Sequence, residues 1–181
     1  MKTLILSIWH DWGGWDQWAT AFWTTEAKET KVIIDSIIKK WIPWITLVKV
    51  PEWLTLAQRT SWINSYLFLT HPVEPFAMEL HLDAGPDTAR WASVWFCAWN
   101  SYTLTEWWQF LSKYTEITGE PSRHVNPDTS DRLWRLWFVR DTKCAALLIE
   151  LWFITNQTDL QTIRTKAIDW IIAWIQNMNK I

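Results

Sequence analysis

The sequence predicts a single α/β domain over residues 1–181, with a mostly parallel, twisted sheet of about six strands and helices on both faces. Two patterns indicate this fold class. Short apolar runs alternate along the chain with longer segments of helical periodicity. Several runs are almost continuously apolar, which is typical of strands that are buried on both faces of a sheet. A length of 181 residues fits one domain with one sizeable core.

The N-terminal half is expected to supply two strands and two helices. The run TLILSI, residues 3–8, stops at polar, glycine-containing sequence and predicts a buried strand. Residues 26–41 carry isoleucines at helical intervals, follow a threonine N-cap candidate and precede Pro43, so we expect a helix there. Residues 46–50 predict a second strand, and residues 54–67 place three apolar side chains roughly on one helical face.

The C-terminal half continues the alternation. Residues 76–82 follow a proline-rich turn and predict a third strand, and residues 92–99 predict a fourth. A helix is expected over residues 103–117, whereas the polar segment 118–131 carries no evident element. The last elements expected are two apolar strands and an amphipathic closing helix, at residues 133–139, 144–151 and 159–178.

Composition and charge narrow the function classes. The net charge is −2 and no basic stripe is present, which argues against a nucleic-acid partner. No apolar stretch approaches the ~20 residues of a membrane span. The two cysteines, Cys97 and Cys144, form neither a disulfide framework nor a CxxC pair. The first apolar run ends without a small-residue cleavage site, so we interpret it as a strand rather than a signal peptide; the localisation stays open.

Polar residues that can bind a metal stand where predicted strands end. His10 follows the first strand, His81 lies at the end of the third, and Glu150 ends the run CAALLI. Glu26 starts the helix after the first loop. Ligands of an open α/β sheet bind beyond the carboxyl ends of its strands. Two histidines and a carboxylate can hold zinc with one position left for water, and a further carboxylate can deprotonate that water.

Each of these residues also has an ordinary structural interpretation, because their spacing forms no compact motif. His81 fits a hydrogen-bonded core histidine, and Glu26 fits a carboxylate that the helix dipole favours in a first turn. Glu150 is harder to explain in this way, since a carboxylate in so apolar a strand needs partners or a raised pKa.

The order of these residues is accompanied by longer local patterns. The first strand leads to Trp9-His10 and then to a loop that ends Asp16-Gln17-Trp18-Ala19. Glu26 follows, with Thr30 four residues later. The later segments are ELHLDA, ARWASVWF and LWFVRDTKCAALLIELWFITNQTDL, at residues 79–84, 89–96 and 136–160.

Taken in order along nearly the whole chain, these patterns resemble the zinc-dependent N-acetylmuramoyl-L-alanine amidases of the amidase-3 type. The last segment is the most specific, because it resembles the family's Glu-Leu-Gly-Phe-x-x-Asn signature. The resemblance implies that His10, Glu26 and His81 bind zinc and that Glu150 is the catalytic carboxylate. Glu29 competes with Glu26 as the third ligand, and the four-residue spacing between Glu26 and Thr30 favours Glu26.

The resemblance also implies a substrate. Enzymes of this family cleave the amide between N-acetylmuramic acid and the L-alanine of the stem peptide, so peptidoglycan is the expected partner. We expect a monomer that acts on the cell wall, either as a phage-type lysin or as an exported enzyme.

Tryptophan and glycine usage is anomalous. The chain has 19 tryptophans and 4 glycines, whereas average usage predicts about 13 glycines. Five tryptophans fall where the family has glycine, namely Trp9, Trp18, Trp91, Trp152 and Trp174. One cause would explain them all: a UGA codon that the source organism reads as glycine has been translated as tryptophan. We therefore hypothesise that the natural protein carries glycine at many of these positions.

Other functions stay open at this point. The tryptophans could form platforms that stack on sugar rings in a carbohydrate- or wall-binding module. The chain could also be an inactive amidase-like fold, or a zinc hydrolase for small peptides. Zinc content and soluble peptide products from purified sacculi discriminate between these alternatives.

Overall fold

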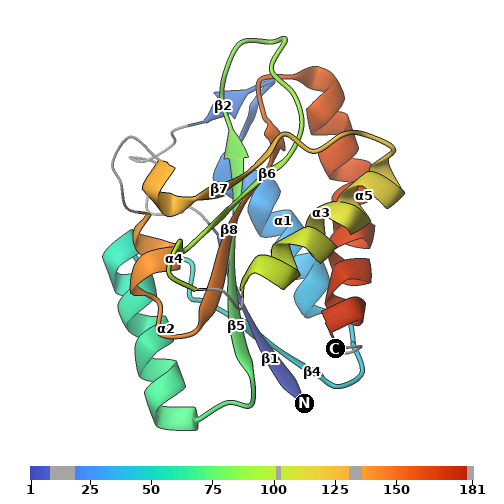
Figure 1. Ribbon diagram of the computed structural model, residues 1–181. Helices are drawn as coiled ribbons and strands as arrows, with labels where there is room; N and C mark the ends of the chain where they lie inside the picture. Colours follow the sequence, from blue (N-terminus) through green and yellow to red (C-terminus); the bar gives the residue numbers. More distant parts are fainter. Residues whose placement is uncertain (9–18, 101–102, 131–135, 179–181) are drawn as a thin grey trace.

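A six-stranded sheet forms the centre of the molecule, in a computed structural model that describes residues 1–8, 19–100, 103–130 and 136–178 (Figure 1). All neighbouring strands are parallel except β8 and β6. The strands lie in the order β4 (Ile45–Lys49), β1 (Lys2–Ile8), β5 (Pro75–Asp83), β8 (Ala145–Phe153), β6 (Ser93–Phe96) and β7 (His124–Pro127). The predicted class, a mostly parallel α/β sheet of about six strands, is confirmed.

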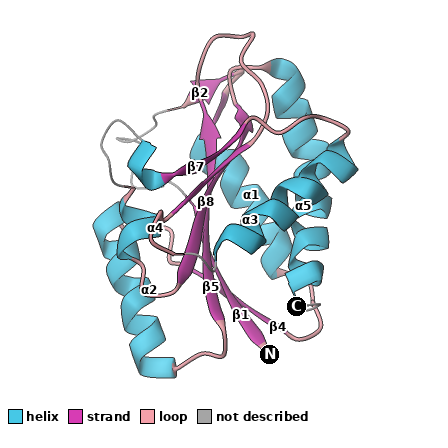
Figure 2. Cartoon of the chain, viewed as in Figure 1, coloured by secondary structure: helices cyan, strands magenta, loops and turns pink. Residues whose placement is uncertain are grey.

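Helices cover both faces of this sheet (Figure 2). One face packs against α1 (Glu26–Ile38), α3 (Thr103–Thr118) and α5 (Gln157–Asn177), and the other against α2 (Leu56–Thr70) and α4 (Trp137–Asp141). Among the described helices, none combines the length and the hydrophobicity that a membrane span requires.

Alternation along the central strands divides the core in two. In β8, Leu147 and Ile149 belong to the large cluster under α1, α3 and α5, whereas Ala146 and Leu148 belong to the smaller cluster under α2 and α4. Successive strand residues point to opposite faces, so Glu150 shares the face of Leu148. Glu79 and His81 share that face by the same rule, since Ala77 of β5 packs in the smaller cluster.

Two sequence-based expectations were wrong. Residues 137–139 were expected in a strand but lie in the short helix α4, while residues 131–135 fall outside the described part. A short apolar run fits either element, and here Phe138 and Val139 bury their side chains against the sheet from a helix. The segment 118–131 was expected to carry no element, yet it forms β7 and the 3-10 turn Asp128–Ser130. The weak apolar signal of β7 fits its place at the sheet edge.

A small hairpin precedes α1 and fixes where that helix begins. Strands β2 (Thr20–Ala21) and β3 (Thr24–Thr25) pair antiparallel around Phe22 and Trp23, both at positive φ. The Thr25 side chain then accepts a hydrogen bond of 3.2 Å from the backbone N–H of Lys28 and caps the helix. The helix therefore begins at Glu26, next to the carboxyl ends of β1 and β5.

Candidate functional site

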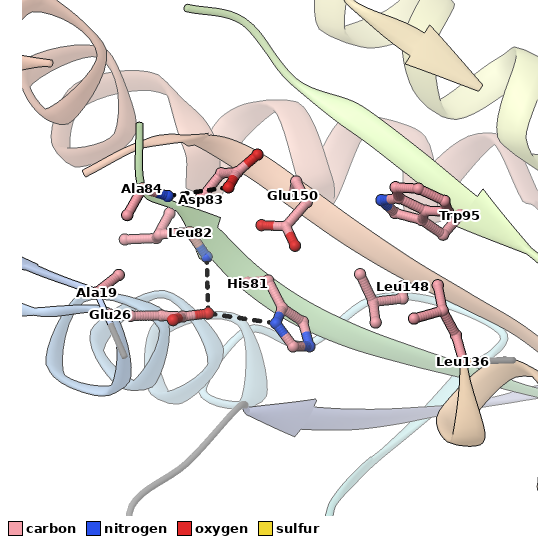
Figure 3. A pocket seen from close by; sticks show the side chains of 10 residues that line it. All are labelled: Ala19, Glu26, His81, Leu82, Asp83, Ala84, Trp95, Leu136, Leu148 and Glu150. Carbon is pink, nitrogen blue, oxygen red and sulfur yellow. Dashed lines mark hydrogen bonds and ion pairs between the residues drawn. The ribbon is translucent and has the colours of Figure 1, made fainter. Parts of the chain in front are cut away.

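A pocket of about 500 Å³ opens at the carboxyl ends of β5 and β8 (Figure 3). Two carboxylates and an imidazole that the sequence predicted as functional line it together, although they come from three separate elements. The lining residues are Ala19, Glu26, His81, Leu82, Asp83, Ala84, Trp95, Leu136, Leu148 and Glu150.

Glu26 and His81 are in direct contact in this pocket. Oε1 of Glu26 lies 3.3 Å from Nδ1 of His81, and the same oxygen accepts a 2.9 Å hydrogen bond from the backbone N–H of Leu82. Each residue is only 6% exposed. The helix start and the strand end are therefore joined through one carboxylate oxygen.

Glu150 lies opposite His81 in the β5–β8 register. Burial raises the pKa of its carboxyl to about 8; His81 opposes this rise, and the carboxylates of Glu26 and Asp83 add to it. Its Oε2 atom is buried and makes no hydrogen bond to any described residue. A carboxyl with a pKa near neutrality is suited to accept a proton and return it within one reaction cycle.

A second carboxylate, which does not line the pocket, contacts His81. Oε2 of Glu79 lies 3.2 Å from Nε2 of His81, and Glu79 is fully buried. Burial lowers the pKa of His81, but the hydrogen bonds with Glu26 and Glu79 outweigh this effect and raise it to about 10. Glu79 was not among the functional residues predicted from the sequence. A charged residue two positions before His81, in an otherwise apolar strand, was the available signal.

Asp83, which lines the pocket, pairs with Arg123. Nη1 of Arg123 donates to Oδ2 of Asp83 at 2.9 Å, and Nη2 donates to Oγ of Ser93 at 2.9 Å. The guanidinium carbon also lies 4.4 Å from the ring centroid of Phe153. Asp83 and Arg123 thus neutralise each other beside the catalytic candidate.

The structure separates the two competing glutamates of the first helix. Glu29 does not line the pocket: its carboxylate accepts hydrogen bonds from Thr24 and from Arg164 of α5. His10, the other predicted histidine ligand, lies outside the described residues. Within the described segments, no group of three or more His, Cys, Asp or Glu side chains is arranged to hold a metal ion. The ligand set therefore stays a prediction.

Comparisons with known proteins identify the fold. The chain has a TM-score of 0.76 and 15% identity to the catalytic domain of CwlV, an N-acetylmuramoyl-L-alanine amidase from Bacillus (Paenibacillus) polymyxa, and the match covers 100% of this chain and 99% of that one. The N-acetylmuramoyl-L-alanine amidase AmiC2 of Nostoc punctiforme matches with a TM-score of 0.75 and 11% identity, over 99% of this chain and 97% of that one. The catalytic domain of the CD27L endolysin, which targets Clostridia difficile, matches with a TM-score of 0.68 and 16% identity, over 97% of this chain and 94% of that one.

No family model and no curated protein matches the sequence. The structural matches show that the chain has the fold of N-acetylmuramoyl-L-alanine amidase catalytic domains, as the sequence resemblance implied.

Proposed function

We propose that this chain is a zinc-dependent peptidoglycan amidase that hydrolyses the amide between N-acetylmuramic acid and the L-alanine of the stem peptide. One observation carries the proposal. Glu26, His81 and Glu150 line a single pocket at the carboxyl ends of β5 and β8, in a fold shared with N-acetylmuramoyl-L-alanine amidases. We further propose that residues 1–181 act as one catalytic domain and as a monomer.

The two described residues of the proposed ligand set are of types that bind zinc. Glu26 and His81 touch each other and supply a carboxylate oxygen and an imidazole nitrogen, which catalytic zinc sites use as ligands. His10, Glu26 and His81 would hold the ion. When bound, zinc supplies a Lewis acid that polarises the scissile carbonyl and acidifies water.

Glu150 supplies the proton transfer in this proposal. Its carboxylate would take a proton from the attacking water and deliver it to the nitrogen of the departing L-alanine amine. Burial supports both steps, because it raises the pKa of Glu150 to about 8. A carboxyl with a pKa near neutrality can both accept a proton and release it again. The unpartnered Oε2 atom, buried among the described residues, is available to accept that proton.

The experiment measures soluble peptide released from purified sacculi, together with bound zinc, for the wild-type protein and for Glu150→Gln. General acid–base catalysis contributes about 10²–10⁴-fold, so we expect the variant to lose activity by that factor while it retains zinc. Glu116→Gln, at an exposed position of α3, is the matched control and should retain full activity. Retained hydrolysis in Glu150→Gln would remove Glu150 from this role, and zinc binding without any hydrolysis in the wild type would favour an inactive amidase-like fold.

We also propose that some tryptophans stand where the natural protein has glycine, because UGA codons are read as glycine in the source organism. Backbone conformation supports this for three of them. Trp23, Trp44 and Trp91 have φ values of 63°, 68° and 79°, a region that glycine occupies without strain. The intact mass of the protein from its native host tests the idea, and a mass that matches the written sequence would refute it. Activity is therefore best measured on two proteins, one with the printed sequence and one with glycine restored at the five positions where the family has glycine.

A further inference from the structure

We propose that Glu79 is a positioning residue for His81: it accepts a hydrogen bond from Nε2–H and thereby leaves Nδ1 as the nitrogen that faces Glu26 and the pocket. This inference rests on the proposed function, because it assigns a role to a side chain that contacts a proposed zinc ligand.

The His81 ring lies between two carboxylates. Nδ1 lies 3.3 Å from Oε1 of Glu26, which lines the pocket, and Nε2 lies 3.2 Å from Oε2 of Glu79, which does not. The geometry of β5 explains the second contact, since residues two apart on a strand point to the same face. One ring nitrogen is therefore directed into the pocket and the other into the protein interior.

Glu79 is itself held from two further elements. Ser7 of β1, its register partner, donates from Oγ to Oε1 at 3.0 Å. Arg59 of α2, which is 1% exposed, places Nη1 3.9 Å from the same oxygen. The two carboxylate oxygens of Glu79 thus have different partners. Oε1 contacts Ser7 and Arg59, while Oε2 contacts His81.

A buried carboxylate is costly unless its partners compensate for lost hydration, so its presence in this apolar strand calls for a role. A purely structural ion pair with Arg59 would be one such role. The contact with Nε2 points to another, because metal-binding histidines commonly donate their second ring N–H to a carboxylate. That bond fixes the ring orientation and the tautomer, and its loss typically costs about 10–100-fold in metal affinity.

The test compares zinc affinity in Glu79→Gln and wild type by competition with a chromophoric chelator, with the metal-free Tm recorded alongside. We expect affinity to fall about 10–100-fold, and the absorption spectrum of the cobalt(II)-substituted protein to change. Glu106→Gln, at another buried acid that lies on α3 outside the pocket, is the matched control and should leave the zinc affinity and the cobalt spectrum unchanged. If Glu79→Gln keeps wild-type zinc affinity and cobalt spectrum, whatever its Tm, Glu79 is only structural and the inference is overturned.

A second measurement decides the matter if Glu79→Gln does not fold. Nitrogen NMR of the His81 ring in the zinc-loaded wild type should show a protonated Nε2 and a metal-bound Nδ1, and the opposite assignment overturns the inference. The two proposals fail separately. Zinc binding with these Glu79 effects but without amide hydrolysis would contradict only the amidase. A wild type that binds no zinc would overturn both.

Discussion

Glu26 and His81 touch through Oε1 and Nδ1 at 3.3 Å, although one begins helix α1 and the other lies near the end of strand β5. The side chain of Thr25 caps the helix immediately before Glu26. The backbone N–H of Leu82 holds the same oxygen of Glu26, so the carboxylate is oriented before any ligand arrives.

Replacing Glu26 with glutamine should abolish tight zinc binding. We expect the loss to exceed the roughly 100-fold that removal of an outer hydrogen-bond partner costs, because a direct ligand would be removed. Isothermal titration with zinc measures it. Glu29→Gln on the same helix is the control, since Glu29 pairs with Arg164 instead of lining the pocket. Zinc loss in Glu29→Gln alone would instead make Glu29 the ligand.

The Glu29–Arg164 pair should stabilise the protein at neutral pH and not in acid. Burial would raise the pKa of Glu29, but hydrogen bonds from Arg164 and Thr24 bring it below its usual value of 4.5. A carboxyl whose pKa is lower in the folded state contributes stability above the unfolded value, and this contribution disappears as the pH falls through the folded value.

Thermal unfolding of wild type and Glu29→Gln checks this linkage. Because the Arg164 side chain is 52% exposed, the difference at neutral pH should be about 1 kcal/mol or less. The difference should shrink as the pH falls below 4.5. A gap between the two proteins that stays constant down to strongly acidic pH would contradict the assignment.

Glu106 should have the opposite effect on stability. Its side chain is 3% exposed, its Oε2 atom has no hydrogen-bond partner among the described residues, and burial raises its pKa. A raised carboxyl pKa in the folded state means that stability decreases as the pH rises above the unfolded value of 4.5. Glu106→Gln should therefore raise Tm at neutral pH and lose this advantage in acid. An equal or lower Tm at neutral pH would show that the carboxylate is compensated after all.

Glycine should be better than tryptophan at exposed positions of positive φ. The side chain of Trp23 is fully exposed and its φ is 63°, so Trp23→Gly removes backbone strain without removing a packed side chain. We expect a gain of about 1 kcal/mol in the free energy of unfolding, measured by denaturant titration. Trp108→Gly is the control, because Trp108 is also exposed but lies within α3, where glycine should cost about 1 kcal/mol. Destabilisation by both substitutions would contradict the strain at Trp23.

Local patterns were sufficient for the long elements. The apolar runs of β1, β5 and β8 and the periodic segments of α1 and α5 carry their burial pattern in consecutive residues, so their type could be predicted. Residues 137–139 and the edge strand β7 were assigned wrongly because both segments are short. What decides them is contact with the rest of the sheet.

The same division applies to the site. The fold class and the residue types at the strand ends could be predicted from consecutive residues, because apolar runs and the polar residues that follow them are local patterns. The packed fold was needed to show that Glu26 rather than Glu29 lines the pocket, and that Glu79 contacts His81 while Ser7 and Arg59 hold it. These arrangements bring together side chains from α1, α2, β1 and β5, so they depend on how the helices pack on the sheet.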